Sequence, residues 1–371
     1  MHIAFYMPFK PLGHTNPSGD LVIGSELFDF LKERGHHLTL ISRLRARWIY
    51  WKPWQILGVP FHLMMASKKV RQSRVDIWLT YHSYYKAPDL LGPLCSQYFK
   101  LPYVIFQGIY ATKYRRRFKT LPGFWLNRYA LLAADLVFTN KSRDYHNLKR
   151  IIPLRRLAYV APGIQPEMFT RCEKARYELR KHWKAMEKPV VLSAAMFRPG
   201  VKTMGIQQVI EACGDLRQKG LDFILVIAGD GEKRSSLQRL AQKRLPQEHI
   251  FLGKIERDQL YRYFSAADLF VFPGINESLG MVYLEAQACG LPVVAMGQWG
   301  ASEVVVPDQT GILINQKKTD NFSDAIARLL YDKKLRHAMG HAARQHVLKN
   351  HNLTLNYELV EQALSSIIHL F

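Results

Sequence analysis

Short apolar runs alternate with longer amphipathic segments along the first half of the chain. The run 3–7 predicts a strand, and apolar residues at helical spacing over 20–33 predict a helix that ends at a Gly35 cap. Strands that alternate with helices indicate a parallel sheet covered on both faces. The further strands predicted in this half are 37–42, 75–80, 103–107, 136–139 and 158–160.

The second half repeats this alternation, which predicts a second doubly wound sheet. A polar, charged stretch over 163–188 is the predicted linker, and 353–371 is predicted to form a terminal helix. The predicted strands are 189–194, 223–228, 250–252, 269–272 and 292–295. The predicted helices are 206–218, 235–244, 257–266, 282–289 and 321–330.

The expected fold class is therefore α/β, with two doubly wound, Rossmann-like domains that face a cleft. The N-terminal domain would span residues 1–168, with the helix 353–371 packing back on it, and the C-terminal domain would span 169–352. Open parallel sheets bind ligands beyond the carboxyl ends of their strands. Two such edges facing each other would hold two substrates, one on each domain.

Composition narrows the class of protein and of partner. The chain has 371 residues, of which 48% are hydrophobic and 22% charged, which excludes wholesale disorder, a coiled coil and a disulfide-stapled miniprotein. The formal net charge is +22, and residues 1–170, with 25 Lys and Arg against 9 Asp and Glu, carry +16 of it. This excess predicts an acidic partner for the first half: nucleic acid, an anionic membrane or a phosphorylated substrate.

The cysteines and the apolar stretches bear on the cellular compartment. Cys95, Cys172, Cys213 and Cys289 lack the spacing of a zinc or redox site, so we expect them to be packing residues in a reducing compartment. The N-terminal residues predict a first strand and not a signal peptide. The longest apolar-rich stretch, 54–66, is too short and too interrupted for a bilayer span, which needs about 20 apolar residues.

Residues 272–300 are the segment richest in candidate chemistry. Gly280 stands at the predicted start of a helix, where backbone N–H groups and the helix dipole bind an anion such as a diphosphate. Glu285 lies farther along that helix, where a carboxylate accepts hydrogen bonds from ribose hydroxyls. Two solvated glutamates on a surface helix would give the same pattern, but the surrounding glycines and the strand–loop–helix order favour a binding site.

This segment resembles the nucleotide-sugar signature of the retaining GT-B glycosyltransferases of glycosyltransferase family 4. Glu277 and Glu285 stand in the order Glu-x7-Glu and precede AQACGLPVV. The resemblance extends over nearly the whole chain, through LKERGHHLTL (31–40), VAPGIQPEMF (160–169), IAGDGEKRSSL (227–237), FLGKI (251–255) and GASEVV (300–305).

The resemblance implies transfer of a sugar from a nucleotide-diphosphate donor with retention of anomeric configuration. Glu285 would hold the donor ribose, Glu277 would lie beside the donor sugar and its phosphate, and Lys202 would lie at the diphosphate. Positive charge and N–H dipoles would stabilise the leaving diphosphate, so neither a cofactor nor a metal is expected. The remaining implied donor contacts are Ser278, Leu279, Gly280 and Met281, and Gly19 at the first helix.

Two positions depart from the family pattern. The family commonly has an arginine five residues before the lysine, whereas this chain has Phe197 there and its arginine one residue later, at Arg198. We expect Arg198 to act as the substitute. The family's N-terminal-domain histidine corresponds to Gln107, which takes no proton at neutral pH, so His82 is a second candidate on the acceptor side. A histidine at a strand end is also commonly only solvated or hydrogen-bonded.

Residues 43–74 and 110–119 combine arginines and lysines with tryptophan and tyrosine. This combination is typical of a membrane interface, where rings lie among headgroups and cations meet anionic lipid. A solvated basic face with internal aromatics is the simpler alternative. Nucleic acid would use the same chemistry, but no nucleic-acid motif is present, so no nucleic-acid partner is expected.

Together these features predict a retaining hexosyltransferase, cytoplasmic and peripheral on the inner face of the cytoplasmic membrane. The donor would bind the C-terminal domain, and a lipid-linked or phosphorylated acceptor of envelope polysaccharide, glycolipid or lipopolysaccharide synthesis would bind the basic N-terminal domain. One alternative is a soluble sugar-phosphate synthase or phosphorylase-like enzyme on the same fold. Another is a non-catalytic membrane- or nucleic-acid-binding protein on a GT-B scaffold, against which Glu277, Glu285 and Lys202 argue.

Overall fold

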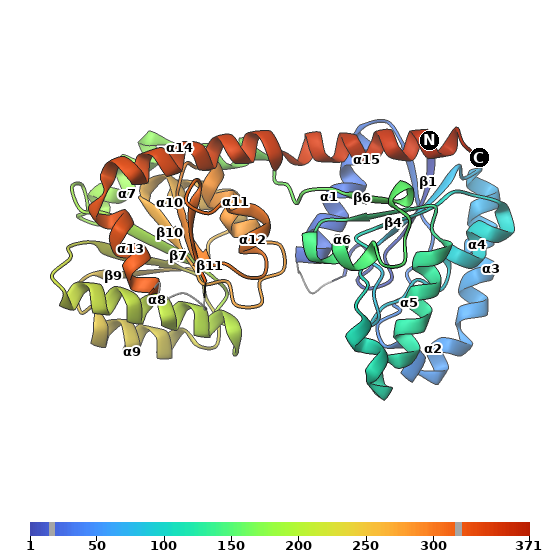
Figure 1. Ribbon diagram of the computed structural model, residues 1–371, viewed down its shortest axis with the longest axis horizontal. Coiled ribbons are helices and arrows are strands. Elements are labelled where there is room, and N and C mark those ends of the chain that lie inside the picture. The colour runs from blue at the N-terminus through green and yellow to red at the C-terminus, as the bar shows by residue number, and fades with distance from the viewer. Residues whose placement is uncertain (15–18, 316–320) are drawn as a thin grey trace. The chain divides into compact units, whose positions relative to one another are not determined.

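The chain forms two compact units in the computed structural model, which describes residues 1–14, 19–315 and 321–371 (Figure 1). The first unit comprises Met1–Ala161 and Thr354–Phe371, and the second comprises Pro162–Leu353. This division lies earlier than the predicted boundary after residue 168, because Ile164 and Phe169 are fully buried in the hydrophobic core of the second unit.

The first unit contains a six-stranded sheet in which every adjacent pair of strands is parallel. The strand order is β2-β1-β3-β4-β5-β6. The bounds are β1 (His2–Tyr6), β2 (His37–Leu40), β3 (Ile77–Tyr81), β4 (Tyr103–Phe106), β5 (Leu136–Thr139) and β6 (Leu157–Tyr159). All six were predicted from their apolar runs, with ends shifted by at most two residues.

Helices connect these strands, and the last helix of the chain belongs to this unit as well. In α15 the ring of Tyr357 lies 5.5 Å from that of Phe30 in α1, and its hydroxyl donates to the Ile23 carbonyl at 3.3 Å. The α-helices are α1 (Gly19–Glu33), α2 (Pro53–Leu57), α3 (Val59–Ser73), α4 (Gly92–Phe99), α5 (Leu121–Ala133), α6 (Ser142–Leu148) and α15 (Leu353–Ile368). Short 3-10 turns include η1 (Ile49–Trp51), η2 (Thr112–Arg116), η3 (Phe118–Thr120) and η4 (Leu154–Arg156).

The second unit has the same architecture, with a parallel sheet in the order β12-β11-β10-β7-β8-β9. Its strands are β7 (Val190–Ala194), β8 (Ile224–Ala228), β9 (His249–Gly253), β10 (Leu269–Val271), β11 (Val293–Met296) and β12 (Gly311–Ile314). Its helices are α7 (Glu173–His182), α8 (Val201–Gln218), α9 (Arg234–Arg244), α10 (Leu260–Ala266), α11 (Met281–Ala288), α12 (Ala301–Val304), α13 (Phe322–Tyr331) and α14 (Lys333–Asn350), with 3-10 turns η5 (Pro166–Phe169) and η6 (Arg257–Gln259). The prediction of a doubly wound α/β chain is confirmed, although it did not include β12, α12 or α14, and α7 lies in the stretch 163–188 that was predicted to be a linker.

None of the helices in the described part of the chain is long and apolar enough to cross a bilayer.

An aspartate directly before a strand fastens the amino-terminal edge of each sheet. Asp76 accepts the backbone N–H of His2 at 2.6 Å, Asp135 accepts that of Tyr103 at 2.9 Å, and in the second unit Asp268 accepts that of Val190 at 2.8 Å. In each case the aspartate's own N–H donates back to the carbonyl of the same residue. The first N–H of a parallel strand has no ladder partner beyond the sheet's end, so a carboxylate there satisfies a group that would otherwise be costly to bury.

Asp268 carries the most contacts of the three. Its two oxygens accept from Arg176 and Arg180, each at 2.8 Å, and both arginines also donate to carbonyls of residues 265–267. Burial alone raises the pKa of Asp268, but the two arginines outweigh it and hold that pKa below its usual value. The carboxylate therefore joins α7 to the starts of β7 and β10.

We predict that Asp268→Asn destabilises the second unit by about 3–5 kcal/mol, because removing one member of a buried ion pair leaves the other uncompensated. The folded-state pKa is depressed, so this stability is present above the unfolded value of about 4 and is lost as pH falls through the folded value. Urea unfolding of the wild type and the variant should therefore differ most near neutral pH and converge in acid. The matched control is Asp222→Asn, since Asp222 is half exposed in its pairs with Lys188 and Arg217 and should cost at most about 1 kcal/mol. If the free energies of unfolding of wild type and Asp268→Asn differ by the same amount down to strongly acidic pH, the ionised Asp268 carboxylate is not the source of the stability.

Candidate active site

Two loops at the carboxyl edge of the second sheet meet through glycines. Gly280 caps α11 with a left-handed backbone, φ 72°, which favours glycine. A Cβ atom at Gly280 would lie 2.7 Å from the Gly300 carbonyl oxygen, and one at Gly300 would lie 2.5 Å from the Gly280 nitrogen. The Gly300 N–H donates to the Glu277 carbonyl at 2.9 Å. The loop before α11 is therefore held against the loop before α12 by a backbone contact that side chains would prevent.

Tyr283 supports the same loop from inside. Its hydroxyl donates to the Phe272 carbonyl at 3.1 Å, and a Cβ atom at Gly274 would lie 1.9 Å from that hydroxyl. Gly274 also has a positive φ of 69°. Tyr283 and Gly274 were not among the predicted site residues, although the glycine-rich order after the strand was the available signal.

The structure brings Lys202 and Glu277 together. The Lys202 ammonium forms a short ion pair with the Glu277 carboxylate, and it lies 5.4 Å from the centre of the Phe272 ring. Lys202 belongs to the first turn of α8, which begins after Gly200 with φ 105°. Both side chains are partly exposed, at 36% and 20%. The pair is accessible to an anionic ligand, which would compete with the carboxylate for the lysine.

The backbone groups predicted to contact a diphosphate are not all equivalent. The Ser278 N–H donates to its neighbour's carboxylate, Glu277 Oε1, at 3.3 Å. The N–H groups of Leu279, Gly280 and Met281 make no hydrogen bond to any residue in the described part of the chain. These three donors sit at the amino end of α11, where the helix dipole favours negative charge.

Glu285 is not a solvated surface glutamate. It is 6% exposed, and its Oε1 accepts from the Arg257 Nε at 2.8 Å. Arg257 comes from η6, before α10, and its guanidinium lies 5.8 Å from the Phe169 ring centre. Arg257 was not among the predicted site residues, because in the sequence this arginine only marks the start of the predicted helix 257–266. A buried carboxylate on α11, one turn beyond the free N–H groups, is fixed in orientation by this arginine.

Phe197 and Arg198 point in different directions. The Phe197 ring is fully buried, with its centre 6.1 Å from that of Phe251. Arg198 is exposed, and its guanidinium makes no hydrogen bond or ion pair with a described residue, while its carbonyl accepts from the Thr203 hydroxyl at 2.6 Å. Phe197 therefore fills the core beneath the loop. That Arg198 substitutes for the missing arginine stays a prediction.

In the first unit, His82 and Gln107 occupy equivalent positions directly after β3 and β4. Both have left-handed backbones, φ 65° and 62°, and are buried, with 6% and 1% exposure. The His82 N–H donates to the Phe106 carbonyl at 2.8 Å, which aligns the two strand ends. Burial lowers the pKa of His82; Asp20 opposes this effect and Lys141 adds to it. We therefore expect a neutral imidazole at neutral pH.

Several polar side chains at this edge have atoms without a hydrogen bond to any described residue. Within the described ranges, neither ring nitrogen of His82 and neither amide atom of Gln107 has a hydrogen bond, and the same holds for the Thr139 hydroxyl and Asn140 Oδ1 after β5. Asp20 Oδ1 lies 3.5 Å from His82 Nδ1, an approach without hydrogen-bond geometry. Buried polar atoms are normally satisfied, so these groups from three adjacent strands are suited to hold a polar ligand. Thr139 and Asn140 were missed, although they too follow a predicted strand.

Gly19 begins α1, beside Asp20. A Cβ atom there would have no described atom within 4 Å, so the surrounding protein does not require glycine at this position. Its predicted role, close approach of backbone to a bound group, stays a prediction. Across the described ranges, His, Cys, Asp and Glu side chains form no group of three or more that could hold a metal ion.

The chain is similar to known transferases in sequence and in structure. The family model "Glycosyl transferases group 1" matches residues 176–346. A GDP-mannose-dependent alpha-(1-6)-phosphatidylinositol monomannoside mannosyltransferase of Mycobacterium tuberculosis is 34% identical over 203 residues, which are 53% of this chain and 52% of the relative. The chain thus spans about half the length of the curated relatives it matches.

Two solved structures share the fold over the whole chain. One is the Anabaena HepE protein in complex with UDP, with a TM-score of 0.77, 17% identity, and coverage of 99% of this chain and 100% of that one. The other is a sucrose-phosphate synthase from Thermosynechococcus elongatus, with a TM-score of 0.75, 17% identity and full coverage of both chains. The predicted GT-B fold class is confirmed.

We predict that Gly280→Ala destabilises the second unit by about 1–3 kcal/mol, because the new Cβ combines a strained backbone with the Gly300 contact. Gly19→Ala is the control, since its neighbourhood is open and its backbone helical, and it should leave stability unchanged or slightly raised. Urea unfolding of both variants measures the difference. Equal midpoints would show that the two loops do not depend on the glycine contact.

Proposed function

We propose that the protein transfers a hexose-type sugar from a nucleotide diphosphate to an acceptor, with retention of anomeric configuration. The match of residues 176–346 to the family model of glycosyl transferases group 1 supports sugar transfer. The donor binds the second unit at the carboxyl edge of its sheet, and the acceptor binds the first unit. Retention rests on the resemblance to glycosyltransferase family 4.

The observation that carries this proposal is the arrangement of Lys202, Glu277 and Glu285 around free backbone N–H groups. The donor diphosphate would accept from the N–H groups of Leu279 to Met281 and displace the Glu277 carboxylate from Lys202. Negative charge grows on the diphosphate as the bond to the sugar breaks, so a cation at Lys202 stabilises the transition state more than the bound donor. The released Glu277 carboxylate would then lie beside a sugar with oxocarbenium character, which an anion stabilises.

Glu285 has a binding role in this proposal. Its Oε1 accepts a hydrogen bond from Arg257, which holds the carboxylate in one orientation. The remaining lone pairs of the carboxylate can then accept from ribose hydroxyls, and because the side chain is already ordered, binding costs little further side-chain entropy. Arg257 acts as a positioning residue. We expect no metal or other cofactor, and the assays below therefore contain EDTA.

The acceptor side rests on the unpaired groups of His82, Gln107, Thr139 and Asn140 at the carboxyl edge of the first sheet. They offer both donors and acceptors, as sugar or inositol hydroxyls require. The excess positive charge of residues 1–170 favours an acceptor that bears phosphate. The name of the mycobacterial relative, which acts on a phosphatidylinositol monomannoside, supports a lipid-linked acceptor.

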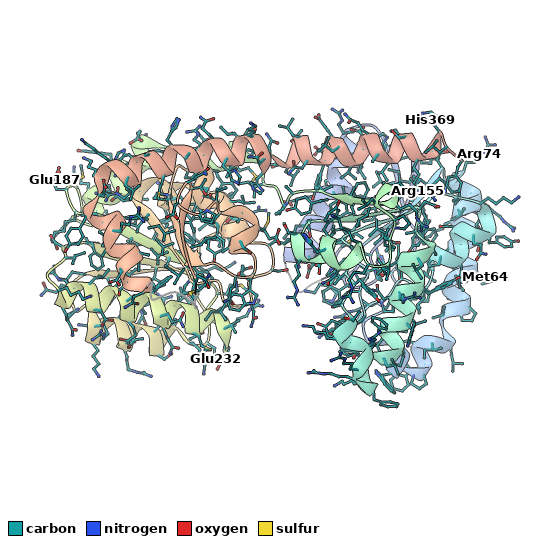
Figure 2. All side chains as sticks on the ribbon, viewed as in Figure 1. Met64, Arg74, Arg155, Glu187, Glu232 and His369 are labelled. Carbon is teal, nitrogen blue, oxygen red and sulfur yellow. The ribbon has the colours of Figure 1, made fainter. Side chains whose placement is uncertain are left out.

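The exposed apolar side chains of α2 and α3, together with η3, support peripheral attachment to a membrane. Leu57 is 80% exposed, Met64 60% and Phe118 80%, and Figure 2 shows Met64 on the outer face of α3. Trp51 joins the two sequence regions, because its ring lies 5.4 Å from that of Phe118 and its indole N–H donates to the Lys119 carbonyl at 2.8 Å. Five cations of η2, η3 and the residue between them adjoin this surface: Lys113, Arg115, Arg116, Arg117 and Lys119.

We define the α2–η3 surface as these apolar side chains and these five cations, and propose that it binds an anionic bilayer on the inner face of the cytoplasmic membrane. Trp48, which lies in the same sequence region, is half buried against Tyr50 and Tyr85 and does not belong to it. This attachment would present a lipid-linked acceptor of glycolipid, lipopolysaccharide or envelope polysaccharide synthesis to the first unit.

Substitutions in the donor site should separate binding from turnover. We expect Glu285→Ala to weaken binding of the nucleoside diphosphate by about 1.5–3 kcal/mol, the value of a charge-assisted hydrogen bond. Lys202→Ala and, to a smaller extent, Arg198→Ala should lower kcat more than affinity. Calorimetry with UDP and GDP and single-turnover assays in EDTA, with the product anomer assigned by NMR, measure these effects.

Glu187→Ala and Lys219→Ala are matched controls, because both side chains are exposed and make no contact with the site. Unchanged nucleotide affinity in Glu285→Ala would refute the ribose role. A silent Arg198→Ala would show that Arg198 does not replace the missing arginine. Activity strictly dependent on added Mg²⁺ or Mn²⁺, or an inverted product, would contradict the proposed reaction.

The α2–η3 surface is tested by co-sedimentation with anionic and neutral liposomes. Replacing Arg115, Arg116 and Arg117 by Gln should weaken binding to anionic liposomes by about 3 kcal/mol, since each cation near the surface contributes about 1 kcal/mol, and high salt should have the same effect. Leu57→Ser with Met64→Ser should remove the binding that remains at moderate salt.

The charge-matched control replaces Arg143, Lys149 and Arg150, which are exposed on or just after α6. The apolar control combines Leu154→Ser and Leu359→Ser, whose side chains are 65% and 58% exposed. If the wild type stays in the supernatant with anionic lipid at low salt, the membrane proposal fails, and a soluble phosphorylated acceptor explains the charge better.

A further inference from the structure

A cavity of about 230 Å³ opens at the amino-terminal edge of the second sheet. Asp268 precedes β10 and Gly290 and Leu291 precede β11, which places the cavity at the edge opposite the candidate donor site. Ala267 and Cys289 adjoin these residues in the chain, and the other lining residues come from α7, the residues before it, and α14. We call it the arginine cavity, because Arg171, Arg176, Arg336 and Arg344 line it.

Positive charge in the arginine cavity exceeds negative charge. The four arginines face a single lining carboxylate, Asp268, whose two oxygens are already occupied by Arg176, Arg180 and the Val190 N–H. Arg171 pairs with Glu173, an exposed residue outside the cavity lining. Within the described part of the chain, Arg336 and Arg344 have no carboxylate partner.

Arg336 shows that the excess charge is built into the fold. It is only 8% exposed, and its Nη1 donates to the carbonyls of Leu329 and Leu330. Its Nε and Nη2 donate to no other described residue. Burial lowers the pKa of Arg336; Asp268 and Asp332 oppose that effect, and Arg176 and Arg180 add to it. The Arg336 nitrogens that make no hydrogen bond to a described residue are therefore available to a ligand in the cavity, and an anion accepts from a guanidinium more strongly than a neutral group does.

Glycines bring this guanidinium to the loop before β11. A Cβ atom at Gly340 would lie 2.2 Å from the Gly290 carbonyl oxygen, so α14 packs there only because it carries glycine. Arg336, Gly340 and Arg344 are spaced by four residues and so share one face of α14. Both arginines are thereby directed to the same side as the contact with residue 290.

We propose that the arginine cavity binds a phosphate monoester. A dianion would offset the uncompensated charge of Arg336 and Arg344, and phosphate oxygens match the forked donors of guanidinium groups better than a single carboxylate would. The volume admits a phosphate with a small organic body. The chemistry is the same for a small phosphorylated metabolite and for a phospholipid headgroup.

This site is separate from the donor site. Helix α11 begins directly after Gly280 in the donor loop, and Cys289 and Gly290, which follow its last residue, line the arginine cavity. Eight residues of helix span about 12 Å, so the two ligands occupy opposite ends of one helix. Nucleotide and phosphate monoester can therefore bind at the same time.

The test is calorimetric titration of the full chain with inorganic phosphate and with glycerol 3-phosphate. Arg344→Gln should weaken binding at least tenfold, and it should fold normally because the Arg344 guanidinium has no protein partner to lose among the described residues. Arg239→Gln, an exposed arginine of α9, removes the same charge and should leave binding within twofold of wild type. Lys202→Ala should also leave it unchanged, since that variant alters only the donor site.

The results distinguish the arginine cavity from the donor site, and a phospholipid headgroup from a soluble phosphorylated metabolite. Binding that survives Arg344→Gln and is lost in Lys202→Ala would place the phosphate at the donor site and overturn the proposal, as would the absence of saturation in the millimolar range. A second measurement asks whether vesicles that contain phosphatidic acid displace bound glycerol 3-phosphate. Displacement identifies a lipid headgroup as the source, and its absence identifies a soluble metabolite. Failure here would leave the donor-site proposal intact, because neither residue of α14 contributes to it.

Discussion

Both sheets depend on the way their parallel strands begin. A parallel ladder leaves the first N–H of a strand without a partner at the amino edge, and in this chain Asp76, Asp135 and Asp268 each supply a carboxylate there. Each aspartate directly precedes a strand and pairs reciprocally with the start of its neighbour. The register of adjacent strands is therefore fixed at the amino edge. The residues at the carboxyl edge are not needed to fix the register, so they can serve ligand binding.

At the carboxyl edges of the sheets, in contrast to the amino edges, several polar groups are not paired with other described residues. Strand ends there pass into left-handed residues or glycines, as at His82, Gln107 and Gly229, and polar groups remain without a described partner or exposed. Such conformations cost free energy and persist where the surrounding structure enforces them. The interactions that stabilise each sheet are thus found at its amino edge, and the groups that can still form hydrogen bonds to a ligand are found at its carboxyl edge. The arginine cavity is the exception, since it adds unused donors to the edge that otherwise serves stability.

Most of the strands, and the helices α1, α8, α9, α10, α11, α13 and α15, could be predicted because their apolar periodicity is a local property of the sequence. Helix α14 was missed because its apolar positions are interrupted by histidines and arginines, and its burial depends on a contact between Gly340 and Gly290. The pairing of Arg257 with Glu285 is likewise a tertiary contact that no spacing encodes. Lys202 and Glu277, 75 residues apart, could be assigned to one site only through the family resemblance. At Phe197, where the resemblance predicts an arginine, the side chain fills the core, which the sequence pattern did not indicate.

The Lys202–Glu277 ion pair links the two functions expected of the donor loop. Each side chain lies on a different element, one in the first turn of α8 and the other before α11, so the pair sets the spacing between two helix amino ends. Both ends favour negative charge, and the carboxylate of Glu277 supplies it in the structure described here. A diphosphate brings more charge than one carboxylate and would replace it without requiring the helices to move. In the proposed reaction the same carboxylate would then be released next to the sugar, where an anion stabilises oxocarbenium character. An ion pair of modest strength at a partly exposed position suits this exchange, because a deeply buried pair would resist the ligand that has to break it.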